Sequence, residues 1–180
     1  LVPNKRVDLV IRAFNQLRLP LIVVGDGVEK RYLEEIAGPT INIMGYQSME
    51  SVKDLMERCR AFVYAGIEDF GIAPVEAMAA GAPVIALAKG GILDTVKCFE
   101  VDPSHATGVL FHDQNVKSLV DSIEFFRDKK LWRDMNSEFI RNWANSFSLD
   151  AFNSGFEKAL NRAWRAFNHS CDIDTSDLKT

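Results

Sequence analysis

Apolar and polar positions follow two different periods along this chain. Between residues 7 and 18 the apolar side chains recur at 7, 10, 11, 14 and 17, which is the spacing of one face of an α-helix. Residues 19–25 form instead a continuous apolar run that ends in glycine, which is typical of a strand buried in a parallel sheet. The alternation continues, and we expect helices at 28–37, 50–59 and 74–81 and strands at 40–45, 61–66, 82–88 and 107–111.

Strands that alternate with helices predict right-handed βαβ units, and hence an α/β fold with a doubly wound, Rossmann-like parallel sheet. From about residue 114 the pattern is helical only, over 114–127, 130–146 and 149–168. We expect one domain over residues 1–168 and a disordered tail over the polar residues 169–180. The last helix carries an apolar stripe that predicts either core packing or a face toward another domain: Phe152, Phe156, Leu160, Trp164 and Phe167.

Composition narrows the classes of function. Apolar residues make up 47% of the 180 residues, which is enough for a packed core. The net charge of -4 argues against binding nucleic acid or an anionic membrane through bulk charge. Cys59, Cys98 and Cys171 lie far apart without metal-ligand or disulfide spacing, so we predict no metal site and a reducing compartment.

Residues with special backbone or side-chain chemistry follow the predicted strands. They are Gly25-Asp26-Gly27, Gly45-Tyr46-Gln47, the loop 66–72, and Lys89-Gly90-Gly91. In an open parallel sheet, ligands bind beyond the carboxyl ends of the strands. We therefore expect these four loops to form one rim around a binding cleft.

The loop at residues 66–72 leads into a helix that we expect to start near Pro74. No Ser, Thr, Asp or Asn at residues 70–73 caps this start, so backbone N–H groups point outward and make an anion site suited to phosphate. Gly71 permits close approach of the backbone. Glu68 in the loop and Glu76 in the expected first helical turn can each accept two hydrogen bonds from a vicinal diol. A diphosphate between two hydroxylated rings, as in a nucleotide-sugar, would fit this arrangement.

Simpler interpretations of the same residues stay open at this point. The whole role of Glu76 could be to complement the helix dipole, a contribution of about 0.3–1 kcal/mol, and Glu68 could be solvated. The two glutamates could also be the acid and base of a hydrolase. Asp172-Ile173-Asp174 matches a metal-diphosphate motif, but no strand precedes it and we interpret it as chance.

The stretch from Glu68 to Ala86, EDFGIAPVEAMAAGAPVIA, carries two glutamates separated by seven residues. With the preceding AFVYA and the following KGG, it closely resembles the GT-B retaining glycosyltransferases of family 4. The likeness extends from VPNKRVDLVIRAF at the start to about residue 127. The resemblance implies the C-terminal, nucleotide-sugar-binding half of a GT-B fold with extra C-terminal helices.

The resemblance also assigns roles to individual residues. Lys5 matches a lysine on the donor diphosphate, and the matching arginine would fall just before Leu1. Glu68 matches the glutamate on the sugar hydroxyls, and Glu76 matches the one on the ribose. The other implied donor-binding residues are the backbone of Phe70, Gly71 and Ile72 around sugar and phosphate, Tyr46 and Gln47 at the base, and Gly25 and Gly27 lining the cleft.

The implied activity is transfer of a sugar with retention and without a metal. We expect GDP-mannose as the donor first and a UDP-sugar second, in surface-polysaccharide or glycolipid assembly. The acceptor, a glycan or a lipid-linked molecule, would bind an N-terminal domain that this chain lacks, so the chain alone should bind donor without turnover. A UDP-sugar epimerase and a noncatalytic nucleotide-binding module are the alternatives. We expect a cytoplasmic location, with peripheral association at the inner face of the membrane left open.

Overall fold

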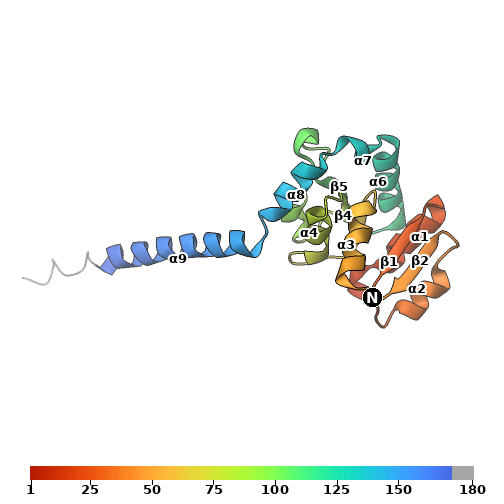
Figure 1. Ribbon diagram of the computed structural model, residues 1–180, viewed down its shortest axis with the longest axis horizontal. Coiled ribbons are helices and arrows are strands. Elements are labelled where there is room, and N and C mark those ends of the chain that lie inside the picture. The colour runs from red at the N-terminus through yellow and green to blue at the C-terminus, as the bar shows by residue number, and fades with distance from the viewer. Residues whose placement is uncertain (172–180) are drawn as a thin grey trace, which may run out of the picture. The chain divides into compact units, whose positions relative to one another are not determined.

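The computed structural model describes residues 1–171, with side chains up to residue 168. The chain divides into two units, residues 1–144 and a unit that begins at Asn145, and each is described by itself (Figure 1). The predicted tail from 172 onward, including Asp172-Ile173-Asp174, lies outside the described residues. Residues 169–171, which were expected in that tail, belong instead to the last helix.

The strands of the first unit pair only in parallel, which confirms the predicted α/β class. β1 (Leu21–Val24) pairs with β2 (Ile41–Gly45). β4 (Val84–Leu87) lies between β3 (Phe62–Tyr64) and β5 (Gly108–Phe111). Hydrogen bonding thus groups the five strands into a two-stranded and a three-stranded sheet. Every residue of β4 and β5 is buried, as their continuous apolar runs predicted.

Helices form where the sequence has a regular helical period of apolar residues. α1 (Val7–Leu17) and α6 (Val116–Asp128) bury one apolar face each and pack against each other. The single helix expected over 130–146 was wrong, because the Asn136 side chain accepts hydrogen bonds from the amides of the two helical residues that follow Ser137 and starts a new helix there. The remaining helices of this region are α2 (Lys30–Ile36), α3 (Met49–Arg58), α4 (Ile72–Ala79), α5 (Ile92–Thr95), α7 (Leu131–Asp134) and α8 (Ser137–Asn145).

The core of the first unit fixes where the strand ends lie. Its main cluster joins the side chains of β4 and β5 to those of α1 and α6, with Leu119 and Phe111 among the most buried. Burying an aliphatic or aromatic side chain of this kind contributes about 1.5–3 kcal/mol. A smaller cluster of Ile11, Val23 and Leu33 packs α1, β1 and α2 together. The loops beyond these strands are therefore carried on a packed scaffold.

The second unit consists, in its described part, of helix α9 (Leu149–Cys171). The predicted stripe lies along one face of it. The rings of Phe152 and Phe156 stack with centroids 6.0 Å apart, and those of Trp164 and Phe167 lie 6.2 Å apart. Searched over the described residues, the chain has no helix long and apolar enough to span a bilayer.

Candidate functional site

A pocket of about 450 Å³ opens where β3 ends and α4 begins. It brings together six residues that the sequence predicted as a site: Lys5, Glu68, Phe70, Gly71, Ile72 and Glu76. Tyr64, Asp69, Ala73 and Pro74 complete its lining. Both glutamates therefore face one shared cleft, as a binding role requires.

The start of α4 is bare, as predicted. Gly71 occupies the N-cap position with φ of 87°, a left-handed conformation that favours glycine, and no side chain caps the helix. Among the described residues, none accepts a hydrogen bond from the amides of Ile72 or Ala73. A missing cap typically costs about 1 kcal/mol, and the free N–H groups with the positive end of the helix dipole favour an anion.

The helix begins two residues earlier than the sequence indicated. The expected start near Pro74 was wrong because Gly71 turns the chain into the helix at Ile72. Glu76 is consequently the fifth helical residue and lies in the second turn rather than the first. Since dipole effects fall off within the first turn, simple complementation of the dipole explains Glu76 poorly. Glu76 is exposed and lines the pocket.

Glu68 is the centre of a small polar network. The ammonium of Lys5 forms an ion pair with Glu68 Oε1, and the hydroxyl of Tyr64 donates to the same oxygen at 2.6 Å. Hydrogen bonds from Lys5 and then Tyr64 hold the pKa of Glu68 below its usual value. Burial, followed by the bond to Glu68, raises the pKa of Tyr64. The carboxylate is thus ionised and the phenol protonated near neutral pH.

The residues of this network come from two segments that are far apart in the sequence, the N-terminal turn and β3 with the loop after it. A 3-10 turn at Pro3–Lys5, with proline at its start and Arg6 at φ 52° after it, presents Lys5 ahead of α1. Gly66 lets that turn pass close to the loop, since a Cβ there would lie 2.8 Å from the carbonyl oxygen of Asn4. Sequence reasoning missed Tyr64, although its place four residues before Glu68 at the end of a strand is a usable signal.

The loop after β4 packs against the Glu68 loop. The amide of Gly91 donates to the carbonyl of Glu68 at 2.8 Å. A Cβ on Gly91 would lie 2.5 Å from Cα of Phe70 and overlap the carbonyl of Asp69. The sequence placed residues 89–91 in the rim, and the structure gives the glycine there a specific reason.

Four predicted residues lie outside this pocket and form a second group at the ends of β1 and β2. The amide of Gly25 donates to the carbonyl of Gly45 at 2.8 Å, which ties the two loops together. Tyr46 is 80% exposed, and Gln47 Nε2 donates to the carbonyl of Met44 at 3.1 Å. Neither these two residues nor Gly25 and Gly27 line the pocket. Their roles toward base and cleft stay predictions.

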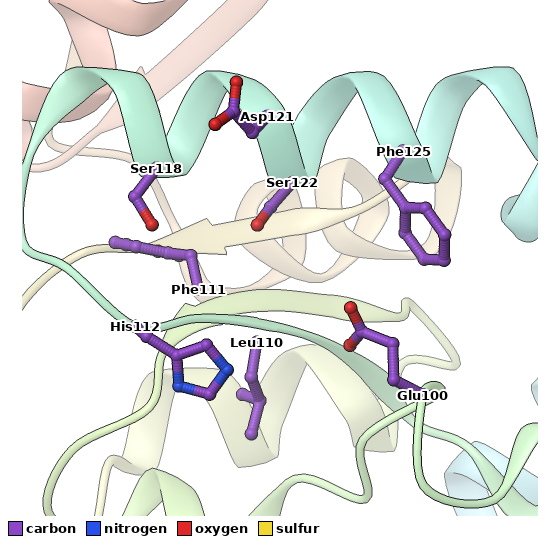
Figure 2. A pocket seen from close by; sticks show the side chains of 8 residues that line it. All are labelled: Glu100, Leu110, Phe111, His112, Ser118, Asp121, Ser122 and Phe125. Atoms are coloured by element: carbon purple, nitrogen blue, oxygen red, sulfur yellow. The ribbon is translucent and has the colours of Figure 1, made fainter.

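A second pocket of about 230 Å³ lies between β5 and α6 and contains none of the predicted residues. Figure 2 shows Ser118 and Ser122 on α6 pointing toward the segment that carries Phe111 and His112. The other lining residues are Glu100, Leu110, Asp121 and Phe125. Here the helix start is capped, because the side chain of Asn115 accepts from the amide of Ser118 at 2.8 Å.

Comparison with known families identifies the family of this chain. The family described as "Glycosyl transferases group 1" matches residues 1–145. Because that match covers most of the chain, the chain belongs to this family. The Glu68–Glu76 pocket lies within the matched residues.

Individual relatives are similar at a distance. An uncharacterized glycosyltransferase of Methanocaldococcus jannaschii, MJ1178, is 28% identical over 163 residues, which cover 87% of this chain and 44% of the relative. The GDP-mannose-dependent alpha-mannosyltransferase of Corynebacterium glutamicum is 26% identical over 162 residues, covering 83% of this chain and 39% of that protein. The chain spans less than half the length of either relative.

Solved structures share the fold. The structure of Anabaena Alr3699/HepE in complex with UDP-glucose matches with a TM-score of 0.72 at 22% identity, over 90% of this chain and 46% of that one. This likeness confirms the predicted α/β fold of GT-B glycosyltransferases. It covers, again, less than half of the compared chain.

Proposed function

We propose that this chain is the donor-binding part of a retaining glycosyltransferase that takes mannose from GDP-mannose. One observation carries the proposal: the bare start of α4 lies between Glu68 and Glu76 in one pocket that also contains Lys5. An anion site flanked by two carboxylates suits a diphosphate with a hydroxylated ring on each side. The activity of the whole protein is part of the proposal.

The predicted site residues divide the task of binding the donor. The amides of Ile72 and Ala73 and the ammonium of Lys5 hold the diphosphate. Glu68 accepts hydrogen bonds from the sugar, and Glu76 accepts them from the ribose. Outside the pocket, Tyr46 and Gln47 serve the base, largely through backbone atoms, and Gly25 and Gly27 line the cleft beside them.

The same groups act on the reaction. When the bond between the sugar C1 and the diphosphate oxygen breaks, negative charge grows on the leaving diphosphate. The acceptor hydroxyl attacks C1 from the same face and gives its proton to the leaving diphosphate. Lys5 and the helix amides stabilise that charge without reorganising. Lys5 must first exchange its partner, since it pairs with Glu68 in the pocket described above.

Two observations bear on the donor. The Corynebacterium glutamicum relative is a GDP-mannose-dependent enzyme by name, and a relative in Kluyveromyces lactis, 33% identical over 105 residues, is an alpha-1,3/1,6-mannosyltransferase. The UDP-glucose complex of the Anabaena protein favours a UDP-sugar as the second candidate. A noncatalytic nucleotide-binding module remains the alternative outside the enzymes.

The acceptor side is proposed to reside outside this chain. A glycan or lipid-linked acceptor would bind an N-terminal domain, and the full-length enzyme could then work at the inner face of the membrane. Over the described residues, no group of three His, Cys, Asp or Glu side chains gathers as metal ligands would. We propose transfer without a metal, from the resemblance alone.

Titration calorimetry tests which nucleotide-sugar is the donor. The chain is titrated with GDP, GDP-mannose, UDP, UDP-glucose and ADP, each with and without EDTA. We expect GDP-mannose to bind most tightly and EDTA to leave its affinity unchanged. Tightest binding of UDP-glucose would replace the donor and keep the class, whereas no binding of any nucleotide would contradict the function.

A further inference from the structure

Two donors converge on a single oxygen of Glu68. Both the Lys5 ammonium and the Tyr64 hydroxyl bind Oε1, and among the described residues none donates to Oε2. A carboxylate held through one oxygen presents the other to a ligand. Since Glu68 lines the pocket, Oε2 is the oxygen available to a hydroxyl that enters it.

The two donors differ in how firmly the fold holds them. Tyr64 is 8% exposed, ends β3, and stacks on Phe62 with ring centroids 6.5 Å apart. The side chain of Lys5 is 39% exposed and has a flexible four-carbon stem. A diphosphate at the start of α4 competes for Lys5, while the Tyr64 hydroxyl has no charge to offer it.

We propose that Tyr64 is a positioning residue for the donor sugar, whose hydroxyl keeps Glu68 in place after Lys5 has turned to the diphosphate. The proposal rests on the donor-binding function above and adds a residue to it. Tyr64 acts on the sugar only through Glu68. Its contribution therefore belongs to the nucleotide-sugar and not to the free nucleotide.

Tyr64→Phe tests this, because it removes the hydroxyl and keeps the packed ring. Tyr32→Phe is the matched control, since its hydroxyl binds Arg12 at 2.9 Å on the surface of α2, outside the pocket. Calorimetry compares a nucleoside diphosphate with its sugar conjugate, using the GDP or the UDP pair that binds the wild type. We expect Tyr64→Phe to weaken the conjugate about tenfold, the loss expected for one hydrogen bond to a charged group, and the diphosphate less than about twofold.

The pH dependence of the same ratio separates positioning from a structural effect. Lys5 and Tyr64 contact Glu68, and Asp69 and Glu76 are the other acidic groups in the pocket lining. The sugar-dependent gain in affinity needs ionised Glu68 and disappears as the pH falls through its pKa. In Tyr64→Phe that loss should move to higher pH, because one group that lowers the pKa of Glu68 is gone.

The outcomes distinguish this proposal from the function on which it rests. If the wild type binds no nucleotide, the donor-binding function fails. If the wild type prefers the conjugate and Tyr64→Phe keeps that preference, or loses both ligands equally, the role of Tyr64 is overturned and the function stands. A wild type that binds the diphosphate and its conjugate equally also overturns the role of Tyr64.

Discussion

Two pockets of the first unit are both lined by carboxylates and other polar groups, yet they differ in what the backbone offers. Beside Glu68 and Glu76 the helix starts at a glycine without a cap, so its amides face the cleft. Beside Glu100 and Ser118 the helix is capped by Asn115, and the hollow runs along the side of α6 (Figure 2). The first pocket thus offers uncapped helix amides to an anion, whereas the helix beside the second pocket has a capped start.

The largest expected effect comes from Gly91, which contacts the Glu68 loop. Gly91→Ala places a Cβ against the backbone of Asp69 and Phe70 and displaces the Glu68 loop. We expect it to lower the free energy of unfolding by about 1–3 kcal/mol and nucleotide affinity by more than about 100-fold. Thermal unfolding and calorimetry measure the two effects.

Gly155→Ala is the control for that substitution. No atom lies within 4 Å of the position its Cβ would take, and the residue lies within α9. Alanine in a helix interior is favoured over glycine by about 0.5–1 kcal/mol, so unfolding should not become easier and nucleotide binding should not change. Full nucleotide affinity in Gly91→Ala would contradict the supporting role of the glycine.

The next prediction compares one glutamate from each pocket by its effect on nucleotide affinity. Glu76→Gln should weaken free nucleotide about tenfold, because the neutral amide accepts the ribose hydroxyls less strongly. Glu100→Gln, in the second pocket, should leave that affinity within about twofold, the usual range for a surface change. Equal effects of the two variants in calorimetry would remove the assignment of Glu76 to the ribose.

Replacing Glu68 should weaken recognition of the sugar without weakening binding of the free nucleotide. Glu68→Gln removes the charge that pairs with Lys5, so Lys5 becomes available to the diphosphate and free nucleotide should bind as well as before or more tightly. The preference for the nucleotide-sugar should fall about tenfold. Parallel titrations with both ligands give the ratio, and a large loss of free nucleotide binding would refute this division of roles.

The smallest effect is the dependence of sugar recognition on pH. Lys5 and Tyr64 lower the pKa of Glu68 in the free protein, and the Tyr64 hydrogen bond still lowers it after Lys5 has turned to the diphosphate, so the carboxylate is ionised through the mildly acidic range. The gain in affinity from the sugar should therefore persist at pH 5 and weaken only at lower pH. A gain that already halves between pH 7 and pH 5 would be inconsistent with this environment.

Much of this site could be predicted from short-range signals. The absence of a capping side chain at residues 70–73 predicted the bare helix start, and the apolar runs predicted β4 and β5. The start at Ile72 could not be predicted, because the left-handed conformation of Gly71 decides it. The contacts of Tyr64 and Gly91 with the Glu68 loop depend on how separate loops cross, which periodicity does not encode.

The second group of predicted residues shows the same limit. Gly25, Gly27, Tyr46 and Gln47 were expected on one rim with Glu68, and the fold gathers them at the ends of β1 and β2. Their loops are joined by a backbone hydrogen bond, yet they do not line the Glu68 pocket. The sequence identified these loops correctly. It did not show that β1 and β2 belong to a different sheet from β3, and so it did not separate their loops from the Glu68 loop.

The most direct test is a titration of the 15N-labelled chain with GDP and UDP, followed by the amide signals. If the bare start of α4 binds the diphosphate, the Ile72 and Ala73 amides should show the largest shifts, and those of Ser118 and Ser122 should stay unchanged. Binding that leaves Ile72 and Ala73 unshifted, or that shifts the residues of the second pocket instead, would contradict the account.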